Sequence, residues 1–213
     1  MTQLSTFNTT KWPVVIIATP RSGSTEFAFQ LWKKFNSVSY PEEFKNATTT
    51  ESFDHLPNTI SCFIEPNKNE KDYEQLMQKV SAGDTNYIVK FMASSVGNDE
   101  LLDRILGTDC FKIKLDRSSL EDQIISLYIA TVAGRWDQHT ADADDFTVPI
   151  NVQEAHKCAN IMKRQRTQLQ SLAINFDADF IYEELDFAAP VDCFKNKQPT
   201  NIEAIRSLIK RFA

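Results

Sequence analysis

The sequence predicts an α/β fold, a single three-layer domain with a mostly parallel central sheet, and three observations predict it. Apolar runs of strand length alternate with segments of helical periodicity along the 213 residues, which is typical of a parallel sheet covered by helices on both faces. The β-branched run 14–17 leads through a tight turn directly into a helical segment. No repeat or low-complexity linker divides the chain, so we expect one domain over residues 1–213.

The same two periodicities locate the individual elements in chain order. A first strand, loop and helix occupy residues 13–36, because apolar residues recur at helical spacing after the turn. Further strands are expected where apolar and β-branched residues cluster, at residues 37–41, 60–64, 87–92, 111–115 and 179–182. Further helices are expected where the spacing is amphipathic, at residues 70–82, 98–106, 119–133, 152–173 and 201–212. The polar segment 45–70 and the acidic segment 138–149 are expected to be mostly irregular.

Composition and charge narrow the functional classes. The hydrophobic content of 42% and charged content of 24% are those of an ordinary soluble protein. The net charge of −6 argues against generic binding to nucleic acid or to an anionic membrane, which needs a basic surface. The four cysteines are far apart and lack metal-ligand spacing, so we expect free thiols and no metal. Neither a signal-peptide pattern nor a membrane-spanning apolar run is present, so we expect a cytoplasmic protein.

The most informative segment is residues 18–25, with the sequence ATPRSGST, directly after the first predicted strand. A strand, a tight turn and a helix offer backbone N–H groups and the positive end of a helix to an anion. Nucleoside-triphosphate loops follow the pattern GxxxxGK[ST], and this segment lacks both the leading glycine and the Gly-Lys pair. The segment therefore predicts a P-loop-like phosphate site of another kind, with an ordinary capped turn as the alternative.

Residues 20–25 (PRSGST) closely resemble the 5′-phosphosulfate loop of sulfotransferases that use 3′-phosphoadenosine-5′-phosphosulfate (PAPS). The resemblance implies that the backbone amides of Ser22, Gly23, Ser24 and Thr25 hold the 5′-phosphate. It also implies that Arg21 stabilises the charge that builds on the bridging oxygen as the sulfuryl group departs. The alternative for Arg21 is a solvated loop cation.

A second anion site is needed because PAPS also carries a 3′-phosphate, and the family supplies an arginine after a strand and a serine in the next helix. Arg117 and Ser126 match this pattern, although they are nine positions apart where the usual spacing is eight. The turn before the helix has room for the extra residue; Ser118 or Ser119, either of which can cap the helix, remains the alternative to Ser126. The following stretch 126–136 and the segment 182–185 (YEEL) are similar to bacterial trehalose-type sulfotransferases.

Other candidates complete the predicted site. Segment 40–44 (YPEEF) resembles the family segment that carries the general base, which implies Glu43, with the neighbouring Glu42 as the alternative. Lys90 is a charge within an apolar strand, and the resemblance implies a second catalytic cation there. The resemblance also implies that Tyr182 contacts adenine, with a core tyrosine as the alternative. The basic pair Lys195 and Lys197 is a candidate for closing over the 3′-phosphate, with a solvated loop as the alternative.

Together these features predict a sulfotransferase that moves a sulfuryl group from PAPS to a hydroxyl or amine of a small-molecule or glycan acceptor. PAPS is then a co-substrate and its desulfated form, PAP, a product; neither a metal nor a nucleic-acid or membrane partner is expected. Two alternatives stay open: a kinase-like P-loop phosphotransferase, and a catalytically inactive nucleotide-binding protein of the same fold. The sequence predicts neither the acceptor nor the oligomeric state.

Overall fold

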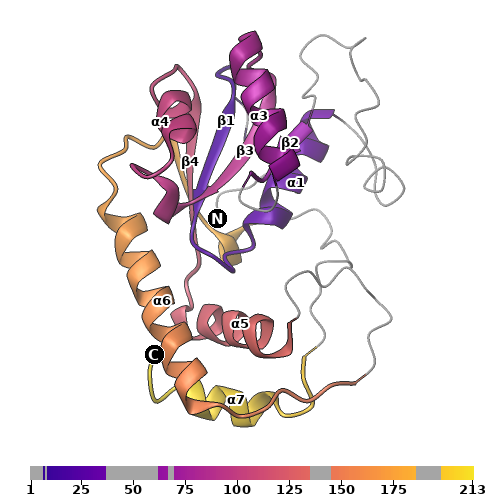
Figure 1. The fold of residues 1–213 in the computed structure, drawn as a ribbon, viewed down its shortest axis with the longest axis vertical. Coiled ribbons are helices and arrows are strands. Elements are labelled where there is room, and N and C mark those ends of the chain that lie inside the picture. Colours follow the sequence, from indigo (N-terminus) through magenta and orange to yellow (C-terminus); the bar gives the residue numbers. More distant parts are fainter. Residues whose placement is uncertain (1–6, 8, 37–61, 67–69, 135–144, 186–197) are drawn as a thin grey trace.

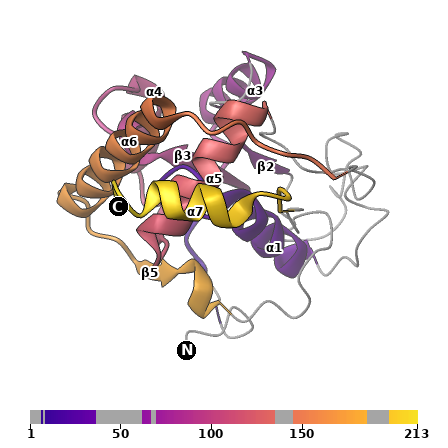
Figure 2. The same ribbon diagram turned by 90° about the horizontal axis from the view of Figure 1, so that it is seen from below.

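The computed structural model describes residues 7, 9–36, 62–66, 70–134, 145–185 and 198–213. The described elements form a sheet with helices on both of its faces and a further group of helices beyond one end (Figures 1 and 2). The predicted strand at 37–41 lies outside the described residues.

The sheet has five strands in the order β2-β3-β1-β4-β5, and all four pairings are parallel. Its strands are β1 (Val14–Ala18), β2 (Cys62–Ile64), β3 (Tyr87–Met92), β4 (Phe111–Asp116) and β5 (Ala178–Ile181). All five residues of β1 are completely buried, as expected for the central strand of a parallel sheet that is covered on both faces. The predicted α/β class with a parallel central sheet is therefore confirmed.

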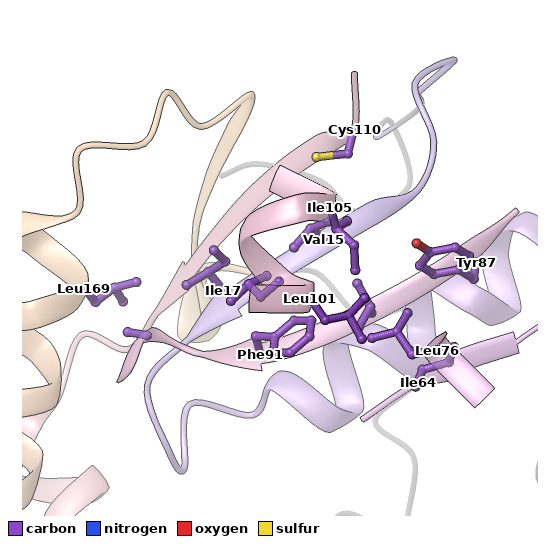
Figure 3. Packing of buried hydrophobic residues seen from close by; sticks show 13 residues of the cluster. Val15, Ile17, Ile64, Leu76, Tyr87, Phe91, Leu101, Ile105, Cys110 and Leu169 are labelled. Carbon is purple, nitrogen blue, oxygen red and sulfur yellow. The ribbon is translucent and has the colours of Figure 1, made fainter. Parts of the chain in front are cut away.

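Alternate residues of β1 enter two separate hydrophobic clusters, because successive side chains of a strand point to opposite faces. On one face Val14, Ile16 and Ala18 pack against apolar residues of α1 (Ser24–Asn36). On the other face Val15 and Ile17 pack with residues of α3 (Glu70–Ala82) and α4 (Glu100–Leu106), and Leu169 closes the cluster from α6 (Val152–Ser171) (Figure 3).

A third hydrophobic cluster joins three helices beyond the carboxyl ends of the strands. It is formed by α5 (Leu120–Ala133), α6 and α7 (Ile202–Ile209). In Figure 1, α5 and α7 lie below the sheet, and Figure 2 shows α7 crossing in front of α5. Tyr128 on α5 ties the cluster to the segment before α6, since its hydroxyl donates to the carbonyl of Pro149 at 2.6 Å. Helices α5, α6 and α7 thus pack together beyond the carboxyl ends of the strands.

Most predicted elements agree with the structure to within a few residues, and the differences have local causes. Helix α5 begins after Ser119, whose hydroxyl accepts from the amide of Asp122 at 3.1 Å, which selects one of the two predicted caps. The last strand ends at Ile181, and Tyr182 begins the 3-10 turn η3 (Tyr182–Glu184) rather than ending the strand. A second such turn, η2 (Ala93–Ser95), follows β3.

Two cysteines in the described part of the chain, Cys110 and Cys158, are buried free thiols. No helix in the described part of the chain is long and apolar enough to cross a membrane.

Candidate functional site

Two loops meet at the carboxyl end of the sheet, where the direction of the chain connections changes. From β1 the chain leads to the β2 edge of the sheet, whereas from β4 it leads to the β5 edge. Open parallel sheets bind their ligands at such switch points, outside the carboxyl ends of the strands. Because β1 and β4 are neighbours, the loops that follow them, residues 19–23 and 117–119, face the same crevice.

The loop after β1 has an unusual backbone at two positions. Arg21 has a φ of 60° and Gly23 a φ of 76°, both in the left-handed region. For a residue with a Cβ atom this conformation costs about 1–2 kcal/mol, which the surrounding contacts must offset at Arg21. Gly23 is also required by space, because a Cβ atom there would lie 2.1 Å from Cε2 of Tyr182. The chain then enters α1 at Ser24, whose first turn presents backbone N–H groups to the crevice.

Polar groups of this loop are buried. The side chain of Ser22 is fully buried, and its hydroxyl has no hydrogen-bond partner among the residues that the structure describes. Gln123 of α5 is equally buried and binds the loop through two hydrogen bonds. Its Nε2 donates to Thr19 Oγ1 at 2.7 Å and to the carbonyl of Pro20 at 3.3 Å. A buried hydroxyl without a partner is costly, so Ser22 marks a place where a polar ligand atom is favoured.

Two hydrogen bonds connect the loop after β1 to helix α5 and to the loop after β4. Arg21 Nε donates to Ser126 Oγ of α5 at 2.9 Å, and Arg117 Nη1 donates to the carbonyl of Arg21 at 3.2 Å. Arg117 and Ser118 precede α5, which begins at Leu120, and Ser126 lies within this helix. Four of the predicted features, the loop, Arg21, Arg117 and Ser126, are thus brought together.

Glu183, in the turn after β5, fixes Arg117 from the other side. Its carboxylate accepts from Arg117 Nε at 2.7 Å and from the backbone amide of Ser118 at 2.9 Å. Partial burial acts to raise the pKa of the Glu183 carboxyl, but these hydrogen bonds outweigh it and hold the pKa below its ordinary value. The guanidinium of Arg117 is therefore held in a defined position beside the loop.

Tyr182 lies beside both Arg117 and the loop. Its ring fills the space against Gly23, its hydroxyl donates to the carboxylate of Glu26 in α1, and the Arg117 guanidinium carbon lies 5.7 Å from the ring centroid. Burial and the adjacent Glu26 carboxylate raise the pKa of the Tyr182 hydroxyl far above its ordinary value. Tyr182 supports the loop in this structure, and its predicted contact with adenine stays a prediction.

Lys90 lies on the opposite side of the loop, on the interior strand β3. Its ammonium forms an ion pair with the carboxylate of Glu65, the residue after β2, and donates to Thr25 Oγ1 at 2.9 Å. Only 3% of the Lys90 side chain and 9% of the Glu65 side chain are exposed. A charged lysine in an apolar strand needs such a partner, so the sequence indicated the need but not the residue that meets it.

The structure thus brings four predicted residues from other elements to the predicted loop residues Arg21, Ser22, Gly23, Ser24 and Thr25. These four are Lys90, Arg117, Ser126 and Tyr182. The other predicted site residues, Glu43 with its alternative Glu42, Lys195 and Lys197, lie outside the described residues. Sequence reasoning missed the roles of Glu26, Glu65 and Gln123. The only local signal for Glu65 is an acid directly after a short apolar strand.

Comparisons with known protein families and with curated proteins identify no relative of this chain. The sequence matches no model of a known protein family, and a search of curated proteins finds no match. Within the described ranges, no group of three or more His, Cys, Asp or Glu side chains is arranged to hold a metal ion. The class that the structure defines is an α/β protein with a parallel sheet and a polar site at its carboxyl end.

Proposed function

We propose that the protein is a sulfotransferase that binds PAPS at the crevice between β1 and β4. The observation that carries the proposal is the pair of bonds that the loop after β1 makes, from Arg21 to Ser126 of α5 and from Arg117 in the loop after β4 to the Arg21 carbonyl. A nucleotide with phosphates at both its 5′ and 3′ positions needs two groups of donors, one for each anion. The loop after β1 and the loop after β4 supply two such groups side by side.

The residues present fit the two ends of this nucleotide. At the 5′ end, the buried Ser22 hydroxyl and the first N–H groups of α1 face a phosphate, with Arg21 and Lys90 on either side of the loop. At the 3′ end, Arg117 and Ser126 offer a guanidinium and a hydroxyl. Both positions join charge to hydrogen-bond donors, which is the combination that binds phosphate most strongly.

Sulfuryl transfer then proceeds by in-line displacement. The acceptor oxygen or nitrogen forms a bond to sulfur while the bond from sulfur to the bridging oxygen breaks, and that bond's electron pair stays on the bridging oxygen of PAP. Arg21 and Lys90 stabilise the negative charge that develops there, and the loop holds the leaving phosphate in line. The acceptor proton passes to a base, for which Glu43 is the sequence-based candidate, and then to solvent.

Calorimetry tests the proposal with three nucleotides: PAPS, PAP and ATP with magnesium. We expect PAPS and PAP to bind with similar affinity in the presence of a chelator, because the protein supplies the donors for both phosphates. Selective binding of magnesium-ATP would instead support a phosphotransferase and overturn the proposal. Binding of PAPS and PAP without any PAP release in the presence of acceptors would support the inactive nucleotide-binding alternative.

The acceptor is open to a direct search. The protein is incubated with PAPS and an extract of small metabolites, and sulfated products are identified by mass spectrometry. A product whose mass rises by one sulfuryl group, and which forms only with active protein and PAPS, identifies the acceptor. The same extract with the Arg21→Ala variant is the control, because that variant lacks the loop cation.

A further inference from the structure

Three polar groups form a closed triangle on the side of the loop away from Arg117. Lys90 donates to Thr25 Oγ1 at 2.9 Å and pairs with the Glu65 carboxylate, and the Thr25 hydroxyl lies 3.4 Å from the same carboxylate. Thr25 is the second residue of α1, so the triangle touches the start of the helix that follows the loop. Lys90 has a role in the proposed function, whereas Glu65 has none there.

The register of the sheet explains why Glu65 is the partner. Strand β2 pairs with β3 so that Ile64 lies opposite Val89, which places the next residue of each strand, Glu65 and Lys90, side by side. Lys90 is also paired with Ile16 of β1, whose side chain points to the face covered by α1. The ammonium therefore emerges between β2 and α1, where a carboxylate after β2 and a hydroxyl on α1 both reach it.

Burial makes this arrangement restrictive for Lys90. A buried ammonium without an opposing charge is strongly disfavoured, and the Glu65 carboxylate supplies that charge. An ammonium has three N–H donors, of which Glu65 and Thr25 take two. The position of Nζ is then set by two protein groups on different elements, rather than by the flexible lysine stem alone.

We propose that Glu65 is a positioning residue for sulfuryl transfer: its carboxylate holds the Lys90 ammonium and the Thr25 hydroxyl in place at the start of α1. The inference rests on the proposed function, because it gives Glu65 a role only through the cation that faces the reacting group. Glu65 touches neither nucleotide nor acceptor in this role. It therefore affects the rate of transfer only through Lys90.

The test measures PAP release from PAPS, with a small-metabolite extract as the acceptor mixture, for the wild type and for Glu65→Gln, Lys90→Met and the double variant. We expect Glu65→Gln to lower kcat by about 10- to 100-fold, because small displacements of a catalytic group have effects of that size. The affinity for PAP, measured by calorimetry, should fall as well, because the oxygen that Lys90 faces stays on PAP as part of its 5′-phosphate. Once Lys90 is absent, Glu65→Gln should lower kcat no further.

Two further variants separate positioning from a general loss of folding. Glu65→Asp keeps the charge and should recover part of the lost kcat, whereas a residue needed only for packing would not be rescued by charge. Asp84→Asn is the matched control, since Asp84 also pairs with a lysine, Lys79, at 2.6 Å, but before the amino end of β3. We expect its kcat to equal that of the wild type.

The outcomes that would overturn the inference differ from those that would overturn the proposed function. If wild-type protein binds PAP and releases it from PAPS, a Glu65→Gln variant with unchanged kcat overturns the inference alone. The same holds if Glu65→Gln lowers kcat equally with and without Lys90. If the wild type neither binds PAPS nor releases PAP, the proposed function fails, and the inference fails with it. If Glu65→Gln is unstable, the double variant Glu65→Leu/Lys90→Met is used instead, because it removes both buried charges together. Its kcat should equal that of Lys90→Met, and a lower kcat would overturn the inference.

Discussion

At the amino end of the sheet, Lys79 pairs with Asp84 at 2.6 Å and Lys11 with Asp177 at 3.3 Å, and all four side chains are partly exposed to solvent. At the carboxyl end, Lys90 and Glu65 form the same kind of pair almost completely buried. Exposed pairs contribute little to stability because water already solvates both partners, whereas burial makes each partner depend on the other. The comparison shows that the ion pairs at the two ends of the sheet differ in burial, and therefore in how strongly each charge needs its partner.

The contrast extends to uncharged polar groups. Of the polar and charged residues that are buried in the described part of the chain, most lie in or just after the carboxyl ends of strands or where the following helices begin; these are Thr19, Ser22, Ser24, Glu26, Glu65, Lys90, Asp116 and Gln123. Buried polar groups oppose folding unless they are satisfied. Their concentration at one end agrees with the nucleotide site that we propose there, and four substitutions test the difference between the two ends.

The largest effect is expected for Arg21→Ala at the carboxyl end. Removal of one group that stabilises developing charge lowers kcat by about 100- to 1,000-fold in comparable sites. We expect a loss of that size in PAP release from PAPS. Arg164→Ala, an exposed arginine on α6, is the matched control and should leave the rate unchanged. Full activity of Arg21→Ala would contradict the role of this end.

The next effect concerns the shape of the same loop. Gly23→Ala places a Cβ atom 2.1 Å from the Tyr182 ring and forces a side chain onto a φ of 76°. Overpacking and backbone strain together predict a loss of about 2–4 kcal/mol in the free energy of unfolding, measured by urea denaturation. Gly97→Ala has a similar φ of 71° but open space, so it isolates the strain and should cost less. Equal losses for the two variants would show that Tyr182 does not restrict the loop.

A third substitution distinguishes the two loops within the carboxyl end. Arg117→Ala should weaken PAP binding by about 10- to 100-fold, because a charge-assisted contact to a phosphate contributes about 1.5–3 kcal/mol. Binding of AMP, which lacks the 3′-phosphate, should change much less, and calorimetry with both nucleotides measures the difference. A parallel loss for PAP and AMP would mean that Arg117 acts through the Arg21 carbonyl and not on the 3′-phosphate.

The smallest effect is expected at the amino end, for Asp177→Asn. The backbone amide of Lys112 and the Lys11 ammonium outweigh partial burial and hold the pKa of the Asp177 carboxyl below its ordinary value of 3.8. A lowered folded-state pKa stabilises the protein above the unfolded value, and this contribution is lost as the pH falls through the folded value. We expect Asp177→Asn to cost about 1 kcal/mol or less at pH 7, and nothing in strong acid. A larger loss in the free energy of unfolding at low pH than at pH 7 would contradict a lowered pKa of Asp177 in the folded protein.

Local sequence patterns predicted the parts of the site that depend on interactions between residues close together in the sequence. The run 14–17 and residues 18–25 were enough to predict a strand, an anion-binding loop and a helix, because burial and turn chemistry act over a few residues. The cap at Ser119 was one of two predicted alternatives, and only the observed start of α5 selects it. Lys90 was recognisable as a charge that needs a partner.

The partners themselves could not be predicted, since they depend on strand order and register. Glu65 reaches Lys90 because β2 and β3 are adjacent and parallel, and a shift of one residue would point the two side chains to opposite faces. Gln123 reaches Thr19 from a helix more than a hundred positions away in sequence. The only local signal for Glu65 is its place directly after a short apolar strand, and no neighbour of Gln123 in the sequence marks it as part of the site.

The sequence by itself determined the α/β class, most element boundaries and the loop at residues 18–25, since periodicity and turn residues are local properties. The tertiary structure alone decided that Arg117 and Ser126 meet Arg21, and that Glu65 and Thr25 enclose Lys90. The physical reason is the order β2-β3-β1-β4-β5, which brings the carboxyl ends of strands far apart in sequence to one edge of the sheet.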